Sequence, residues 1–227
     1  MQGRAMKART AFLVLLTVGV VGTAAWLVFF SPVLGVRSIE IVGNVTVSGE
    51  EIEQRAEVAD LHPLATVDLA GVESRVMGIR RLAGAKAERV WPGTLKIQVV
   101  ERRPVAAVPV GEQVAIVDKQ GVVIEVKTSV PPLLPQIKVD RSAEGDPALM
   151  AALEVIQVVP GAVAVRVKEV RAGTAEGVTL VLSDGRTVIW GGADRPKEKG
   201  RILTSLLRRE RDATRYDVSS PDVVTLK

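Results

Sequence analysis

Few residues in this sequence could carry out chemistry, and their types already narrow the function. The chain has no cysteine and a single histidine, His62. Without cysteine, neither thiol catalysis nor a disulfide framework is available. His62 has no thiol or second histidine with which to bind a metal or to form a catalytic triad. We therefore expect His62 to be a surface or turn residue in the loop before Pro63.

The remaining candidate residues lack the spacing that their chemistry requires. Ser219 and Ser220 do not belong to a G-x-S-x-G elbow and have no histidine nearby in the sequence. The stretch WGGADRPKEKG, residues 190–200, is basic and contains glycine, but it lacks the spacing of a P-loop. The adjacent carboxylates of Glu50 and Glu51 are expected on the outer face of a helix. Because no nucleophile, base and stabilising group converge, we predict that the chain is not an enzyme and uses no cofactor, metal or small-molecule substrate.

The elements around these residues begin with an uncharged segment, TAFLVLLTVGVVGTAAWLVFF, at residues 10–30. As a helix it would be about 31 Å long, which matches a hydrocarbon core of roughly 30 Å. A cleaved signal peptide would have a shorter apolar run and a small-residue cleavage site, and neither is clear here. The segment therefore predicts a retained transmembrane helix in the bilayer, and a buried core helix is the other alternative.

Charge decides the expected orientation of this helix. Arg4, Lys7 and Arg9 precede it without an acidic residue, and within ten residues only Arg37 follows. The positive-inside rule then predicts a short cytoplasmic arm at residues 1–9 and an extracytoplasmic body. The arm supplies most of the formal net charge of +4. The body is thus nearly neutral, so we expect no nucleic-acid partner.

Residues 34–103 are predicted to form a small β-α-α-β-β unit. The alternating stretch VRSIEIVGN predicts the first strand, and Ser48 followed by Glu51 is a capping box that begins a helix. Asp68 is expected to cap a second helix with a stripe of apolar residues. Two strands then flank Trp91-Pro92-Gly93, whose Pro-Gly pair suits a type II turn. In the second of these strands, 94–101, Glu101 and the two arginines after it are expected to keep the tip in water, and Pro104 then ends the ladder.

Residues 104–227 predict a mixed, β-rich domain with at least two helices. Hairpins are expected around 118–121 and at Asp184-Gly185. Asp146 followed by proline is expected to cap one helix, and a second helix is predicted within 193–212, with Ile202, Leu203, Leu206 and Leu207 as its buried stripe. Tyr216 to Val218 and Val223 to Leu226 are short strand candidates separated by Ser219-Ser220-Pro221.

Three phrases, VRSIEIVGNVTVSGEEI, VWPGTLKIQVVERRPVA and VDKQGVVIE, resemble the bacterial cell-division family FtsQ/DivIB. The order of elements in residues 34–103 resembles a POTRA domain, and the resemblance extends from the anchor to near the C-terminus. It implies an α+β protein with a cytoplasmic arm (1–9), a transmembrane helix (10–30), a POTRA domain (34–103) and a C-terminal β domain (104–227). It also implies a non-enzymatic scaffold of the divisome in the cytoplasmic membrane at the division septum.

The resemblance further implies that the end of the second domain receives small bitopic partners of the FtsB/DivIC and FtsL types, among other divisome components. We expect strand addition there, because an exposed sheet edge is a template for another chain. The same residues could instead complete the domain's own sheet, and both can hold. The expected contact residues are Tyr216, Ser219, Ser220, Pro221, Val223, Val224 and Thr225.

Two other functions remain open from the residues. A POTRA-type module for polypeptide assembly or secretion would also bind extended chains by adding a strand to an exposed sheet edge. Such proteins usually carry a β-barrel, whereas this chain has a predicted transmembrane helix and too few residues left for a barrel. A membrane-bound cell-wall hydrolase that uses only carboxylates would be revealed by substituting them and measuring peptidoglycan digestion.

Overall fold

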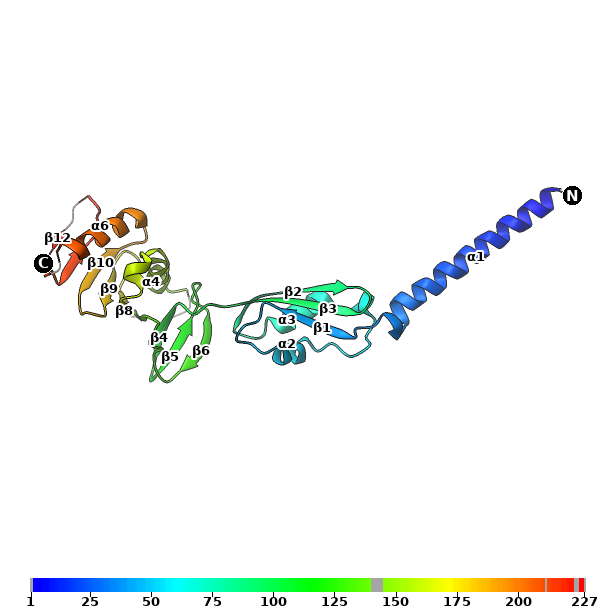
Figure 1. Cartoon of the computed structure of the whole chain (residues 1–227), viewed down its shortest axis with the longest axis horizontal. Coiled ribbons are helices and arrows are strands. Elements are labelled where there is room, and N and C mark those ends of the chain that lie inside the picture. Colours follow the sequence, from blue (N-terminus) through cyan, green and yellow to red (C-terminus); the bar gives the residue numbers. More distant parts are fainter. Residues whose placement is uncertain (1, 140–144, 211, 223–224, 227) are drawn as a thin grey trace. The chain divides into compact units, whose positions relative to one another are not determined.

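The computed structural model describes residues 2–139, 145–210, 212–222 and 225–226. The chain divides into two compact units, Met1–Glu101 and Arg102–Lys227, and each is described by itself (Figure 1). Helices and strands occur in both units, and an apolar helix lies at the N-terminus. The predicted α+β fold class is therefore confirmed.

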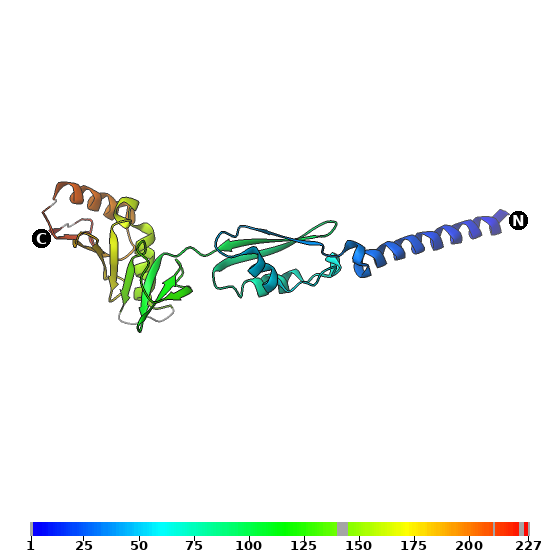
Figure 2. The same ribbon diagram turned by 60° about the horizontal axis from the view of Figure 1, so that its bottom comes forward.

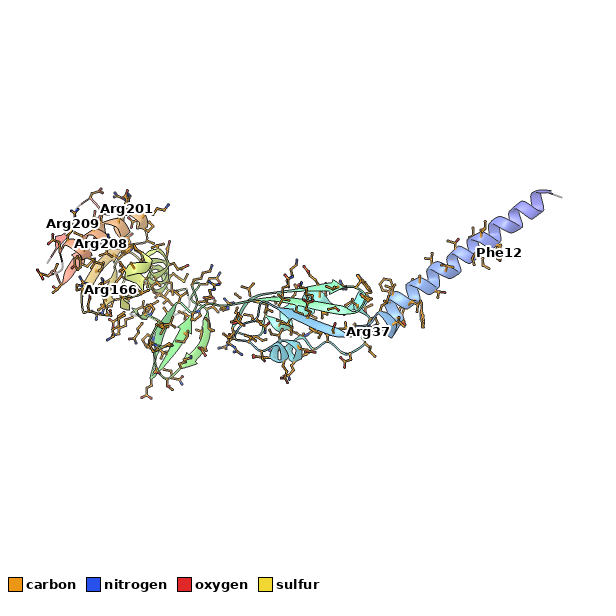
Figure 3. All side chains as sticks on the ribbon, viewed as in Figure 1. Phe12, Arg37, Arg166, Arg201, Arg208 and Arg209 are labelled. Carbon is orange, nitrogen blue, oxygen red and sulfur yellow. The ribbon has the colours of Figure 1, made fainter. Side chains whose placement is uncertain are left out.

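The N-terminal helix α1 (Gln2–Phe30) begins before the predicted start at Thr10. Its segment Phe12–Phe30, 19 residues, is long and apolar enough to cross a membrane. None of this segment is buried inside the protein, and most of its apolar side chains are exposed. Figure 3 shows Phe12 projecting from the side of α1. An unpacked apolar helix of this length is what a bilayer-spanning segment requires.

A three-stranded sheet with the order β1-β3-β2 forms the centre of the first unit. β1 is parallel to β3, and β2 is antiparallel to it, so the strand that the sequence placed last in the unit lies in the middle of the sheet. The α helices cover one face, as the apolar stripes predicted. The elements are η1 (Pro32–Leu34), β1 (Ser38–Val42), α2 (Gly49–Ala56), η2 (Leu64–Thr66), α3 (Leu69–Val76), β2 (Leu82–Val90) and β3 (Thr94–Glu101).

Both predicted helix caps of this unit are confirmed. The side chain of Ser48 accepts a hydrogen bond from the Glu51 amide at 3.1 Å, and Asp68 accepts one from the Gly71 amide at 3.0 Å. The capping box is only half formed, because the Glu51 carboxylate pairs with Arg81 at 2.6 Å. This ion pair connects α2 to the residue before β2.

The turn between β2 and β3 differs from the type II turn expected. Gly93 does not adopt the positive φ that the third position of such a turn requires, and the Trp91–Pro92 peptide bond is cis. Glycine is needed here for close approach instead. A Cβ atom on Gly93 would lie 2.9 Å from the carbonyl oxygen of Gly35, and the Gly93 carbonyl accepts a hydrogen bond from the Arg37 amide at 2.7 Å.

Glu101, at the end of β3, does not lie free in water as expected. Its carboxylate accepts hydrogen bonds from the backbone amides of Val45, Thr46 and Val47 at 2.6 to 3.0 Å and from the Thr46 hydroxyl at 2.5 Å. Partial burial alone would raise its pKa, but these donors outweigh that effect and hold the pKa at about 2. Arg102 is not free either, because it pairs with the largely buried Asp118 at 2.6 Å.

We expect the substitution Glu101→Gln to lower the free energy of unfolding of the first unit by about 1–3 kcal/mol at pH 7. Because the folded pKa lies below the ordinary value, the contribution of Glu101 is complete above about pH 4.5 and is lost as the pH falls towards 2. Denaturant unfolding followed by the fluorescence of Trp91 measures the difference at pH 7 and pH 3. The exposed Glu53, substituted by Gln, is the control, and a Glu101 effect that did not shrink at pH 3 would contradict the assignment.

A nine-stranded mixed sheet dominates the second unit, in the order β12-β11-β10-β9-β8-β7-β4-β5-β6. Its outer strands are therefore β12 and β6. The elements are β4 (Ala106–Val110), β5 (Gln113–Val117), β6 (Val123–Lys127), β7 (Gln136–Val139), α4 (Pro147–Val158), α5 (Gly161–Ala164), β8 (Val167–Ala172), β9 (Val178–Leu182), β10 (Thr187–Gly191), α6 (Pro196–Arg209), β11 (Arg215–Asp217) and β12 (Thr225–Leu226).

Helices α4 and α6 share one hydrophobic core with the sheet (Figure 2). Leu153 of α4, Leu180 of β9 and Trp190 of β10 are all completely buried in it. Asp146 caps α4 as predicted, because its carboxylate accepts hydrogen bonds from the amides of Ala148 and Leu149. Both predicted hairpins are present, and α6 begins at Pro196, three residues after the start of the predicted stretch. The C-terminal strands β11 and β12 thus lie at one end of this sheet.

Candidate partner-binding edge

The residues first considered for catalysis take structural positions. The ring nitrogen Nε2 of His62 lies 3.2 Å from the Thr66 hydroxyl in an exposed loop, and the described residues include no group of three potential metal-ligating side chains. Ser219 donates its hydroxyl proton to the Asp217 carboxylate at 2.7 Å. That bond belongs to a turn that ends β11. Both side chains are thus hydrogen-bonded within local turns of the fold.

The edge of the second sheet is built from two short strands at the C-terminal end. β11 pairs in parallel with β10, where Tyr216 lies opposite Val188, and β12 pairs antiparallel with β11, where Leu226 lies opposite Tyr216. No strand among the described residues pairs with the other side of β12. Its outer backbone groups are thus placed to hydrogen-bond with an added strand.

The side chain of Tyr216 anchors β11 in the hydrophobic core. Its side chain is completely buried, and its hydroxyl donates a hydrogen bond to the Glu210 carbonyl at 2.6 Å. Arg186 donates to the same hydroxyl at 3.3 Å, with its guanidinium carbon 5.9 Å from the ring centroid. Arg186 is in turn held by the Asp184 carboxylate at 2.6 Å, and their hydrogen bonds lower the pKa of Asp184 well below its usual range. The side chain of Tyr216, which was expected among the contact residues, is thus covered by the packed core and supports β11.

Two further contacts hold the segment between β11 and β12. Gly191 has a φ of +75°, and a Cβ atom there would lie 3.0 Å from the Cβ of Ser219, so the end of β10 passes close to this segment. Arg195 donates to both carboxylate oxygens of Asp222, at 2.8 and 3.1 Å, and to Glu198 at 2.7 Å. The hydrogen bonds from Arg195 lower the pKa of the Asp222 carboxyl. The segment is thus fastened to the start of α6.

The structure brings together only part of the predicted contact set. Ser220 is exposed, Ser219 and Pro221 are half-buried, and Thr225 lies in β12. Val223 and Val224 lie outside the described residues. The strand candidate at 223–226 completes the domain's own sheet at Thr225–Leu226, which is one of the two alternatives left open by the sequence.

Sequence reasoning missed the residues that hold this edge in place. Arg195 lies 27 residues from Asp222, and Arg186 lies 30 residues from Tyr216, so no local pattern links them. Arg195 also adopts a left-handed conformation, with a φ of 46°, which is unusual for a residue with a Cβ atom. Only the Asp217–Ser219 pair, two residues apart, carried a local signal for a side-chain turn.

Comparison with known proteins identifies the two units. Residues 34–102 match the model of the FtsQ-type POTRA domain, and residues 106–223 match that of the C-terminal region of the cell division protein FtsQ/DivIB. This chain belongs to the FtsQ/DivIB family. FtsQ/DivIB proteins are components of the cell-division machinery, which implies protein partners, and they are not a known enzyme family. The family and the apolar α1 together indicate a membrane-anchored division protein.

Individual FtsQ proteins are similar along most of the chain. The cell division protein FtsQ of Mycolicibacterium smegmatis is 40% identical over 88% of this chain and 60% of that protein, and that of Mycobacterium bovis is 39% identical over 99% of this chain and 70% of that protein. FtsQ of Streptomyces bingchenggensis is 35% identical over 86% of this chain and 77% of that protein. The chain thus spans about 60 to 70% of the length of the first two relatives.

One solved structure also aligns with part of the chain. It is the major extracytoplasmic domain of the cell division protein DivIB from Geobacillus stearothermophilus. The alignment covers 48% of this chain and 97% of that domain. The sequence identity is 20% and the TM-score is 0.35, so this likeness carries no argument here.

Proposed function

We propose that this FtsQ/DivIB-family chain is a non-enzymatic scaffold that recruits bitopic septal proteins to the divisome by strand addition at β12. The observation that carries the proposal is the edge itself. β12 is two residues long, ends a nine-stranded sheet, and has no strand of the described part of the chain on its outer side. Backbone hydrogen bonds to such an edge give affinity, and side chains on the added strand give specificity.

The packing of the neighbouring strand favours this role. Tyr216 and Val218 are completely buried, and the Val218 amide donates to the Ile189 carbonyl of β10 at 2.9 Å. A strand that is held in this way gives β12 a fixed neighbour, which lowers the conformational entropy lost when a partner binds. Small bitopic proteins of the FtsB/DivIC and FtsL types are the partners we assign, together with other divisome components. Their contacts would include Ser219, Ser220, Pro221, Val223, Val224 and Thr225, with Tyr216 as a buried support.

The proposed topology follows from charge. Arg4, Lys7 and Arg9 precede the apolar segment Phe12–Phe30 without an acidic residue. The positive-inside rule then places the N-terminus in the cytoplasm and both folded units outside the cytoplasmic membrane. In that arrangement the β12 edge meets partners whose extracytoplasmic parts are also anchored in the membrane. Their shared plane raises the effective concentration of one for the other.

Depletion of the chain in its own host tests the divisome role. We expect filamentous cells after depletion, because a scaffold that links division proteins is needed for the septum to form. A functional fluorescent fusion should concentrate at mid-cell, and a second wild-type copy should restore normal cell length. Normal division after complete depletion would refute the scaffold proposal.

A further inference from the structure

A groove of about 1120 Å³ lies within the second unit, between α6 and the end of α4. Val158, Pro160 and Pro196 give it an apolar floor. The rest of its lining comes from one side of α6. These residues are Lys197, Gly200, Arg201, Thr204, Ser205, Arg208 and Arg209.

Close packing at Gly200 shapes the groove. Gly200 is buried, and a Cβ atom there would lie 2.7 Å from Cγ of Pro160. The glycine therefore lets α6 approach Pro160 directly, which brings the helix's outer side chains to the border of the apolar floor. Lys197, Arg201 and Arg208 recur at spacings of four and seven residues, so they lie along one side of α6.

The charge of this lining is uniformly positive. Lys197, Arg201, Arg208 and Arg209 are exposed, the lining includes no acidic residue, and none of the four forms an ion pair within the described ranges. Figure 3 shows Arg201, Arg208 and Arg209 projecting from α6. Arg166 of the same unit, by contrast, pairs with the Asp184 carboxylate. The basic side chains along the groove are thus available to form ion pairs with acidic groups of a bound partner.

We propose that this groove binds an acidic amphipathic helix of a protein partner. A helix laid into a groove buries one apolar face, and the floor of Val158, Pro160 and Pro196 offers the surface for that face. Carboxylates that flank the apolar face would reach Arg201 and Arg208 and form charge-assisted hydrogen bonds. An anionic polymer without apolar groups would leave the floor uncovered, so the combination favours a polypeptide.

The site goes beyond strand addition at β12 and does not depend on it. A smaller depression of about 470 Å³ shares Arg201 and Ser205 with the groove and reaches Pro221, close to the segment before β12. The two surfaces are therefore neighbours within one unit, yet the groove is lined by α4 and α6 and includes none of residues 219–227. Removing those residues leaves every residue that lines the groove in place.

A designed peptide tests the proposal on the full chain in neutral phosphatidylcholine nanodiscs. The probe is an 18-residue fluorescent helix with leucine on one face and glutamate on the other, and its counterpart carries lysine in place of glutamate. We expect the acidic peptide to bind, the basic peptide not to bind, and the affinity to fall with added salt. The double variant Arg201→Glu, Arg208→Glu should bind at least about tenfold more weakly, since two favourable charge pairs become repulsive.

The matched control is Lys168→Glu on β8, which reverses an exposed charge outside the groove lining. It should leave binding unchanged, and the chain lacking residues 219–227 should still bind the peptide. All variants are first checked for an unchanged thermal unfolding transition. Absence of binding, an equal loss with Lys168→Glu, or groove-dependent binding of phosphatidylglycerol vesicles without peptide binding would each overturn the proposal.

Discussion

Tyr216→Ala is expected to lower the free energy of unfolding of the second unit by about 3–5 kcal/mol, because it empties a fully buried aromatic site. The ring supports β11, so its loss should also loosen β12, which pairs with it. Denaturant unfolding followed by the fluorescence of Trp190 measures the effect, since Trp190 is completely buried in the same core. Trp26 and Trp91 belong to the other unit and are exposed.

Two further variants separate the effect of losing the aromatic ring from the effects of losing the hydroxyl and of changing an exposed residue nearby. Tyr216→Phe keeps the ring and removes the hydroxyl, with its hydrogen bond to the Glu210 carbonyl and the longer one from Arg186, so we expect a loss of about 1–2 kcal/mol. Ser220→Ala changes an exposed neighbour and should alter stability by less than about 0.5 kcal/mol. A Tyr216→Ala protein as stable as the Ser220→Ala protein would contradict the assigned burial and support of β11.

Local sequence patterns predicted the helix caps and tight turns, because the interactions that form them lie within a few residues of the chain. Ser48, Asp68 and Asp146 cap their helices as expected, because a cap needs only a side-chain acceptor two or three residues before a free amide. The hairpin at Asp184-Gly185 is similar, since Gly185 adopts the φ of +87° that a tight turn requires. Each of these signals spans fewer than five residues.

Long-range pairing explains what the sequence did not predict. Glu101 was expected in water, but it accepts three amides of a loop more than fifty residues earlier. Lysine is seldom fully buried, yet Lys199 of α6 is completely buried and donates to Asp194 at 2.7 Å and to the Gly192 carbonyl at 3.1 Å. These charges are satisfied by partners that only the folded chain brings together.

The sequence predicted where the candidate edge lies in the chain, but not which side chains hold it in place. The alternation and turn residues after Arg215 indicated two short strands, and both occur. The burial of Tyr216 was missed because a tyrosine in a three-residue strand has no periodicity that shows which face it takes. The support from Arg186 and Arg195 was missed because it comes from β10 and from the start of α6.

Removing residues 219–227 is expected to abolish partner binding while leaving the second unit folded. The deletion takes away β12 and the segment before it but keeps Tyr216 and Val218, which are completely buried. It also removes the exposed Arg195–Asp222 ion pair, and such surface pairs contribute little to stability. We expect the dissociation constant for an FtsB/DivIC-type ectodomain to rise by about a hundredfold or more, because backbone pairing at the edge is lost.

The most direct test of the central claim is the affinity of that ectodomain for the full chain in nanodiscs, measured by biolayer interferometry with and without residues 219–227. Val126→Ala on β6, at the opposite end of the same sheet, serves as the control, and Trp190 fluorescence confirms that each variant is folded. Strand addition at β12 predicts that the deletion removes binding and that Val126→Ala leaves it unchanged. Undiminished binding to the folded deletion variant would contradict the proposal.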